Sequence, residues 1–243
     1  MGVTHHGRTQ RLDLADPSLR EWQCTVLDSG PDGIVLDRSA FYPGGGGQPP
    51  DHGVLLWQGV QTRIVDTRKG DDLYLVPAET DPVPPVGTAV TGAVEDERRT
   101  LLMRTHSGLH VLCGVVFRDF GALVTGGNMQ PGEARMDFNL PEVPPDFKSG
   151  LEDAVNAEIV ADRRIDVRVL PRDAALAIPD IVRTQAKLIP HDEPEIRVVD
   201  ILGLDVQADG GTHVASTAQV GRVQVTKVES KGKANRRVRL KLA

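Results

Sequence analysis

The chain has 243 residues, 40% of them hydrophobic, which is enough for one large domain or two small ones with separate cores. The sequence has neither a long apolar run nor the apolar segment of a secretion signal, so we expect a cytoplasmic protein without a membrane-spanning helix. The two cysteines, Cys24 and Cys113, exclude a disulfide framework, and the net charge of -6 argues against a surface that binds nucleic acid everywhere.

The first part of the chain consists of short apolar segments separated by Gly and Pro. Val, Leu and Ile are frequent in these segments, which have the length of ordinary strands. This pattern predicts a small β-barrel within a first domain, residues 1–95. Its expected strands are 22–29, 33–38, 53–58, 62–67, 73–76 and 89–94.

The pattern changes at Asp96, where we expect a second domain, 96–243, of α+β class. A stretch without Pro and with acidic residues in its first turn predicts a helix at 96–117. The elements expected after it are a strand at 134–140, a helix at 151–164 and strands at 166–170, 195–201, 221–230 and 236–243. The last two strands should form a hairpin, because apolar and basic residues alternate strictly along the final one.

A pair of histidines lies within the predicted helix. His106 and His110 are four residues apart, so both imidazoles project from the same helix face and can bind a common ion. The spacing alone is weak evidence, since two ordinary surface histidines also occur at this distance. The intervening Ser, Gly and Leu lack the glutamate of the HExxH motif, which disfavours a metallopeptidase.

A second pair lies about a hundred residues further on. Asp209 and His213 flank two glycines that disfavour a helix, and a tight turn after a strand can direct both side chains to one side. Three imidazoles and one carboxylate suit a single Zn²⁺ ion, which polarises a carbonyl and activates a bound water. The two pairs therefore predict a metal-dependent hydrolase.

Three blocks of sequence resemble the alanyl-tRNA editing proteins. They are SAFYPGGGGQPPDHG (39–53), LMRTHSGLHVL (102–112) and DVQADGGTHVASTAQVG (205–221), and the closing SKGKANRRVRL is similar to the family's C-terminal hairpin. The resemblance covers nearly the whole chain. It implies the editing fold of alanyl- and threonyl-tRNA synthetases, preceded by a small β-barrel as in the longer members of the family.

The resemblance assigns His106, His110 and His213 to metal ligands, but places Asp209 where the commonest family pattern has Cys. A carboxylate has the same charge as a thiolate and remains an ordinary zinc ligand. Asp209 is therefore expected to bind the metal; the alternative is that it stands off as the general base for the attacking water.

The glycine run Gly44–Gly47 is not followed by the GK[ST] of a phosphate loop, so on sequence alone it is a flexible loop or a functional one. The resemblance implies that it reaches toward the editing pocket. On this interpretation Ser39 helps to recognise the amino-acid side chain of the substrate. The other substrate-binding residues are Gly45, Gly46, Gly47 and Gln48.

The resemblance implies an ATP-independent deacylase that removes serine, or glycine, from mischarged alanine tRNA in trans, without an obligate protein partner. Basic residues crowd the C-terminal end, which is either a solvated strand face or a contact for tRNA phosphates through Lys231, Lys233, Arg236 and Arg237. The competing hypotheses are a non-catalytic tRNA-binding module that retains the metal, and a metal-dependent hydrolase of another small ester.

Overall fold

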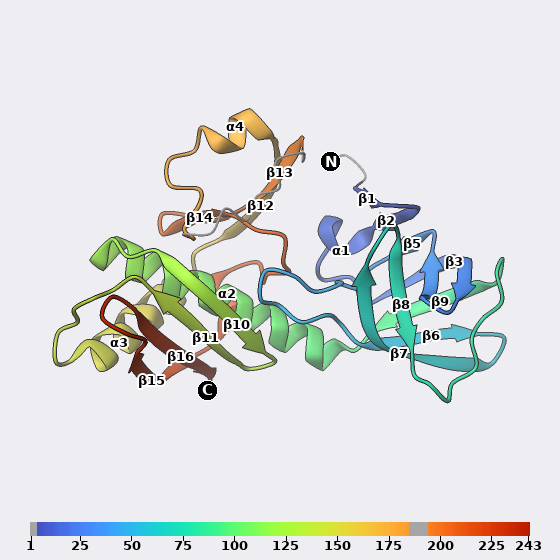
Figure 1. Ribbon diagram of the computed structural model, residues 1–243, viewed down its shortest axis with the longest axis horizontal. Coiled ribbons are helices and arrows are strands. Elements are labelled where there is room, and N and C mark those ends of the chain that lie inside the picture. The colour runs from blue at the N-terminus through green and yellow to red at the C-terminus, as the bar shows by residue number, and fades with distance from the viewer. Residues whose placement is uncertain (1–3, 185–193) are drawn as a thin grey trace. The chain divides into compact units, whose positions relative to one another are not determined.

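The computed structural model describes residues 4–184 and 194–243, and the chain forms two compact units, Met1–Thr100 and Leu101–Ala243 (Figure 1). Unit 1 begins with a small sheet in the order β1-β2-β5. The elements that accompany this sheet are β1 (His5–His6), β2 (Thr9–Arg11), α1 (Leu12–Ala15) and β5 (Arg38–Ser39). None of the helices within the described residues is long and apolar enough to cross a membrane.

The remaining strands of unit 1 close into a barrel in the order β3-β4-β8-β7-β6-β9, which confirms the predicted barrel. They are β3 (Glu21–Gly30), β4 (Gly33–Leu36), β6 (Gly53–Trp57), β7 (Val60–Lys69), β8 (Leu73–Pro77) and β9 (Ala89–Val94). Along β3, buried Trp22 and Cys24 alternate with exposed Glu21 and Gln23. Trp22 lies opposite Gly92, where a Cβ atom would be 2.4 Å from the indole ring, so only glycine fits beneath it.

Unit 2 is built around the long helix α2 (Asp96–Phe120), which begins in unit 1 and extends past the predicted end. A four-stranded antiparallel sheet has the order β10-β11-β16-β15, and a three-stranded one has the order β12-β13-β14. The strands are β10 (Val124–Gln130), β11 (Glu133–Phe138), β12 (Ile165–Pro171), β13 (Glu195–Ile201), β14 (Asp205–Ala208), β15 (Val223–Ser230) and β16 (Arg236–Leu242). The α+β class and the C-terminal hairpin of β15 and β16 are confirmed.

The other helices of unit 2 are α3 (Phe147–Val160), α4 (Arg172–Leu176) and the 3-10 helix η1 (Thr217–Val220). Helix α3 begins four residues before its predicted start, and it ends earlier because Asp162 adopts a positive φ of 49°. Strand β10 (sequence VTGGNMQ) was not predicted, since its glycines interrupt the apolar pattern.

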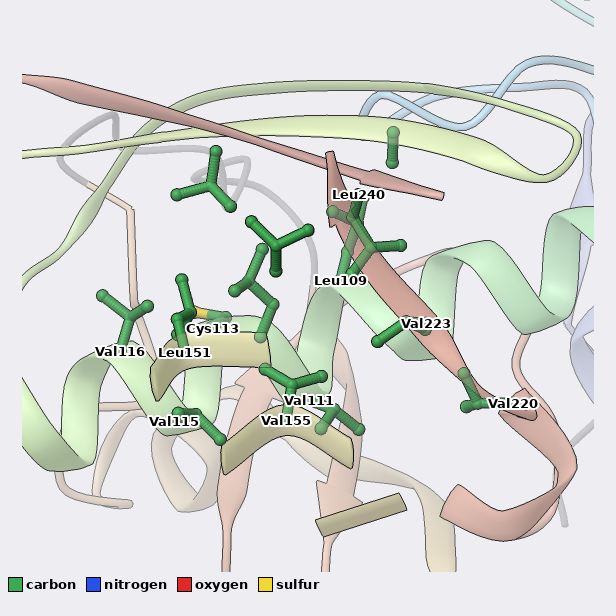
Figure 2. Packing of buried hydrophobic residues seen from close by; sticks show 14 of the residues in the cluster. Leu109, Val111, Cys113, Val115, Val116, Leu151, Val155, Val220, Val223 and Leu240 are labelled. Atoms are coloured by element: carbon green, nitrogen blue, oxygen red, sulfur yellow. The ribbon is translucent and has the colours of Figure 1, made fainter. Parts of the chain in front are cut away.

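The core of unit 2 joins both helices to the four-stranded sheet. Figure 2 shows Leu109 of α2 near Leu240 and Val223, and Leu151 and Val155 of α3 beside the next turns of α2. On β16, buried Val238, Leu240 and Leu242 alternate with exposed or half-buried basic residues. The helix that contains the histidine pair is therefore fixed by packing on several sides.

Candidate metal centre

Helix α2 presents two buried imidazoles to the interior of unit 2. His106 and His110 are each 5% exposed, and their ring centroids are 5.1 Å apart. The helix is favoured locally by Asp96 and Glu97 in its first turn and Arg118 in its last, which complement the helix dipole. The predicted one-turn spacing therefore places both rings on the same side of a rigid element.

The second pair of candidate ligands lies in a turn directly after β14. The N–H of Asp209 donates to the carbonyl of Arg197 (3.1 Å), and the Arg197 guanidinium donates to the Asp209 carbonyl (3.0 Å). The Asp209 carboxylate accepts the N–H of Gly211 at 2.6 Å, which closes a local side-chain turn. These bonds fix the backbone so that both Asp209 and His213 face α2.

The four side chains converge. Three imidazole Nε2 atoms surround the Asp209 carboxylate: His106 at 3.6 Å, His110 at 4.0 Å and His213 at 3.0 Å. The candidate ligand atoms of these residues all lie within 4.8 Å of one another. The structure thus brings together the four residues that the sequence singled out as the metal site.

Burial decides which of these groups carry charge. Burial lowers the pKa of His106 to about 4 and that of His213 well below its ordinary value, so both rings are neutral near pH 7. Burial also opposes the charge of Asp209, but the neighbouring imidazoles, His106 first, hold the pKa of that carboxyl well below its usual range. For His110, burial lowers the pKa but is outweighed by the neighbouring carboxylates of Asp205 and Asp209, so the net direction is upward.

This donor set fits a divalent metal ion. Zinc bonds of about 2.0–2.2 Å in tetrahedral geometry place neighbouring ligand atoms roughly 3.4 Å apart. The separations of 3.0 to 4.0 Å between the imidazole nitrogens and the Asp209 oxygens bracket that spacing. The neutral imidazoles of His106 and His213 and the ionised carboxylate of Asp209 are in protonation states that a metal requires. The cluster could therefore hold one metal ion, whose identity the donor set does not fix.

Three further polar residues touch the outer nitrogens of the rings, and sequence reasoning missed them. Ser107 Oγ lies 3.1 Å from Nδ1 of His213 and accepts the N–H of Val214. Gln207 Nε2 is 3.4 Å from Nδ1 of His110, and an Asp205 oxygen is 3.6 Å from the same nitrogen. The only sequence signal was their position inside the two ligand blocks, since their contacts depend on how α2 packs against β14.

The glycine run of unit 1 forms a tight turn. The N–H groups of Gly45 and Gln48 each donate to the other residue's carbonyl at 3.0 Å, and Gly46 and Gly47 have φ values of 58° and 90°. Two consecutive positive φ values define a type I′ turn, which explains the glycines without a ligand. Gly45, Gly46 and Gly47 are exposed, whereas Gln48 is buried.

Ser39 is also buried in unit 1, where its hydroxyl accepts the N–H of Phe41 at 3.1 Å. The base of the glycine turn is held by Asp51, which accepts the Tyr42 N–H at 2.7 Å and is paired with the fully buried Arg99. These bonds account for the local fold. The substrate-binding roles of Ser39, Gln48 and the glycines stay predictions.

The basic residues of the C-terminal hairpin fall into two groups. Arg237 makes two 2.7 Å bonds to the carboxylate of Asp137 on the neighbouring strand, and Arg236 donates to the carbonyl of Pro141. Lys231 and Lys233 lie exposed in the turn between β15 and β16. Strand pairing therefore already neutralises Arg237. The two lysines of the turn are exposed to solvent.

The comparisons with known proteins agree with this geometry. The family model of the threonyl and alanyl tRNA synthetase second additional domain matches residues 196–239, and that of class II (A) tRNA synthetases matches 17–98. Alanine–tRNA ligase of Pyrobaculum neutrophilum is 36% identical over 91% of this chain, which covers only 25% of that enzyme.

Two relatives match over nearly their whole length. The alanyl-tRNA editing protein AlaX-M of Saccharolobus solfataricus is 35% identical over 235 residues, 95% of this chain and 97% of the relative. AlaX-M of Methanosarcina mazei is 31% identical over 95% of both chains. With its barrel, its α+β unit and its cluster of three histidines and an aspartate, the chain belongs to the AlaX-M family of alanyl-tRNA editing proteins.

Proposed function

We propose that this protein is a metal-dependent esterase that removes serine, and secondarily glycine, from mischarged alanine tRNA in trans. The observation that carries the proposal is the buried convergence of three imidazoles and a carboxylate in a chain of this family. Editing has a physical reason: a synthetase pocket for alanine cannot strongly reject glycine, which is smaller, or serine, which only adds a hydroxyl. A second site must then hydrolyse the wrong product.

In this proposal His106, His110, His213 and Asp209 hold one divalent ion, with Zn²⁺ the best match to the donor set. When bound, such an ion polarises an ester carbonyl and lowers the pKa of a coordinated water toward 7. The protein's own contribution is to hold the four donors together, with the three imidazoles buried and the Asp209 side chain 14% exposed. The convergence of Asp209 with the three imidazoles, including Oδ1 at 3.6 Å and 4.0 Å from Nε2 of His106 and His110, supports ligation; the alternative role as general base is tested by its removal.

The remaining predicted residues supply binding in this proposal. Ser39 and the motif Gly45, Gly46, Gly47 and Gln48 belong to a first domain, 1–95, that helps to select the amino acid. The turn lysines Lys231 and Lys233 contact phosphates of the acceptor stem, with Arg236 and Arg237 beside them. Lys231 and Lys233 are exposed in the β15–β16 turn, and this exposure supports a phosphate contact by the two lysines more directly than by the two arginines.

The direct test is release of serine from Ser-tRNA(Ala) by the metal-loaded protein, with Gly-tRNA(Ala) and Ala-tRNA(Ala) in parallel. We expect fast release of serine, slower release of glycine and little release of alanine. If micromolar protein releases no serine above the buffer rate, the result would indicate a non-catalytic tRNA-binding module. Cleavage of small esters without action on any of the three charged tRNAs would instead indicate a different hydrolase.

A further inference from the structure

We propose that Asp205, held in place by Arg183, is a positioning residue that fixes the His110 ring so that Nε2 faces the metal. This inference rests on the proposed metal-binding role of His110. It assigns a function to two charged residues that lie outside the ligand set, of which Asp205 opens the sequence block 205–221 and Arg183 lies outside the three blocks.

Asp205 is a buried carboxylate directed at the outer nitrogen of His110. Its side chain is 0% exposed, and Oδ2 lies 3.6 Å from His110 Nδ1. The same oxygen accepts a 2.5 Å bond from the Gln207 amide nitrogen, which itself lies 3.4 Å from His110 Nδ1, and Oδ1 accepts a 3.2 Å bond from Nε of Arg183. A carboxylate withdrawn from water in this way is costly unless it is paired and hydrogen-bonded, so its place in the fold requires these partners.

Arg183 is itself held by the helix that contains His110. Its guanidinium lies 3.5 Å above the ring centroid of Phe117 on α2, and its backbone carbonyl accepts the N–H of Val124 at 2.8 Å. Its side chain is 10% exposed. The cation is thus stacked and anchored in a fixed position, which in turn fixes the Asp205 carboxylate against α2.

Helix α2 leaves space for this carboxylate. Gly114 lies one turn beyond His110, and a Cβ atom there would be 2.9 Å from the Cβ of Asp205 and 2.8 Å from Cγ of Leu204. A larger residue at this position would push β14 away from the helix. The glycine therefore permits the close approach that brings Asp205 to His110.

The chemical consequence follows from the two nitrogens of the ring. When Nδ1–H is directed at a carboxylate, Nε2 keeps its lone pair for the metal and becomes a stronger donor. The outer nitrogen of His213 faces the neutral hydroxyl of Ser107 instead. Of these two ligands, His110 is the one whose outer nitrogen faces an anion.

The test is the metal affinity of Asp205→Asn, measured by competition with a chromophoric zinc chelator. The substitution removes the charge at nearly constant volume, and we expect it to weaken Zn²⁺ binding about 10- to 100-fold. Excess Zn²⁺ should restore full occupancy of the site. The matched control is Asp200→Asn, which removes a carboxylate paired with exposed Arg168 on the same small sheet. We expect its affinity to stay within about 2-fold of wild type, and an equal loss in both variants would contradict a specific role for Asp205.

Asp205→Asn also leaves Arg183 buried without its anion, so a second variant separates positioning from folding. In Asp205→Asn/Arg183→Gln both charges are gone, and no buried charge is left unpaired. If Asp205 positions His110, this protein is folded but still binds Zn²⁺ weakly. Zinc affinity at the wild-type level in the double variant would overturn the proposal.

The absorption spectrum of the Co²⁺-loaded protein reports ligand geometry independently of any tRNA assay. We expect the visible bands to shift in Asp205→Asn and to remain unchanged in Asp200→Asn. Identical bands in all three proteins would count against positioning. Metal binding without deacylation by the wild-type protein would refute the proposed function and leave this inference intact.

Discussion

At the scale of single residues, the fourth candidate ligand is the carboxylate of Asp209, where the resemblance drawn from the sequence implies Cys. One oxygen of Asp209 faces His106 and His110, and the other is bonded to Gly211 and His213. Both oxygens are therefore directed among the other donors. This arrangement is compatible with ligation, and the two candidate roles of Asp209 predict different outcomes when its carboxylate is removed.

We expect Asp209→Ala to lose metal and deacylase activity together, with affinity for Zn²⁺ lowered more than about 100-fold. Asp209→Cys should keep a full metal equivalent, because a thiolate supplies the same charge. Metal content and serine release measured on the same samples check this. Full metal occupancy in Asp209→Ala with activity abolished would instead identify Asp209 as the base.

The two thiols give a prediction about pH. Burial raises the pKa of Cys24 to about 12 and raises that of Cys113 also, so at pH 8 both remain protonated in the folded protein. Because the thiolate is the nucleophile, we expect neither to react with iodoacetamide at pH 8 until the protein unfolds. Rapid alkylation of the native protein, followed by mass spectrometry, would show that one thiol is accessible.

At the scale of elements, the sequence pattern predicted the strands and helices whose formation depends on neighbouring residues. The period-two strands of the barrel and the one-turn spacing of the histidines in α2 are set by residues close in sequence. The partners Ser107, Gln207 and Asp205 could not be predicted, since their roles depend on packing between α2 and β14. Likewise, the neutralisation of Arg237 by Asp137 appears only when β16 pairs with β11.

Two helical glycines provide a matched test of that packing. A Cβ atom added at Gly150 on α3 would have nothing within 4 Å, whereas one added at Gly114 on α2 would meet Leu204 and Asp205. Gly150→Ala should stabilise the protein by up to about 1 kcal/mol through helix propensity. Gly114→Ala should destabilise it by about 1–3 kcal/mol through overpacking.

Urea unfolding of the metal-free proteins measures both changes. The two variants are expected to change the free energy of unfolding in opposite directions, although both replace Gly with Ala. Equal stabilisation by the two variants would mean that β14 does not lie tightly against α2.

At the scale of the whole molecule, an acidic protein with a basic end is suited to bind and release tRNA. The net charge is -6, but from Arg222 onward basic residues outnumber the single acid, Glu229. Both Lys227 and Arg239 pair with that acid, and Lys241 pairs with Glu133, so ion pairs within and between the strands already engage much of this charge. The turn with Lys231 and Lys233 is left as the main candidate for phosphate contacts.

Deacylation should therefore depend on salt through these lysines. We expect KM for charged tRNA to rise with ionic strength, and Lys231→Ala/Lys233→Ala to raise KM and flatten the log–log salt slope by about 1 to 2. The matched control is Lys148→Ala, which removes an exposed charge from α3. An unchanged slope in the double variant would place the tRNA contact elsewhere.

The cluster of three histidines and an aspartate should support ester hydrolysis only when it holds one metal ion. The most direct test of this dependence is to titrate the metal-free protein with Zn²⁺ while measuring serine release from Ser-tRNA(Ala). We expect no release without metal and a linear rise in the rate of release that ends at one equivalent of Zn²⁺ per chain. Undiminished release from the metal-free protein would contradict this expectation.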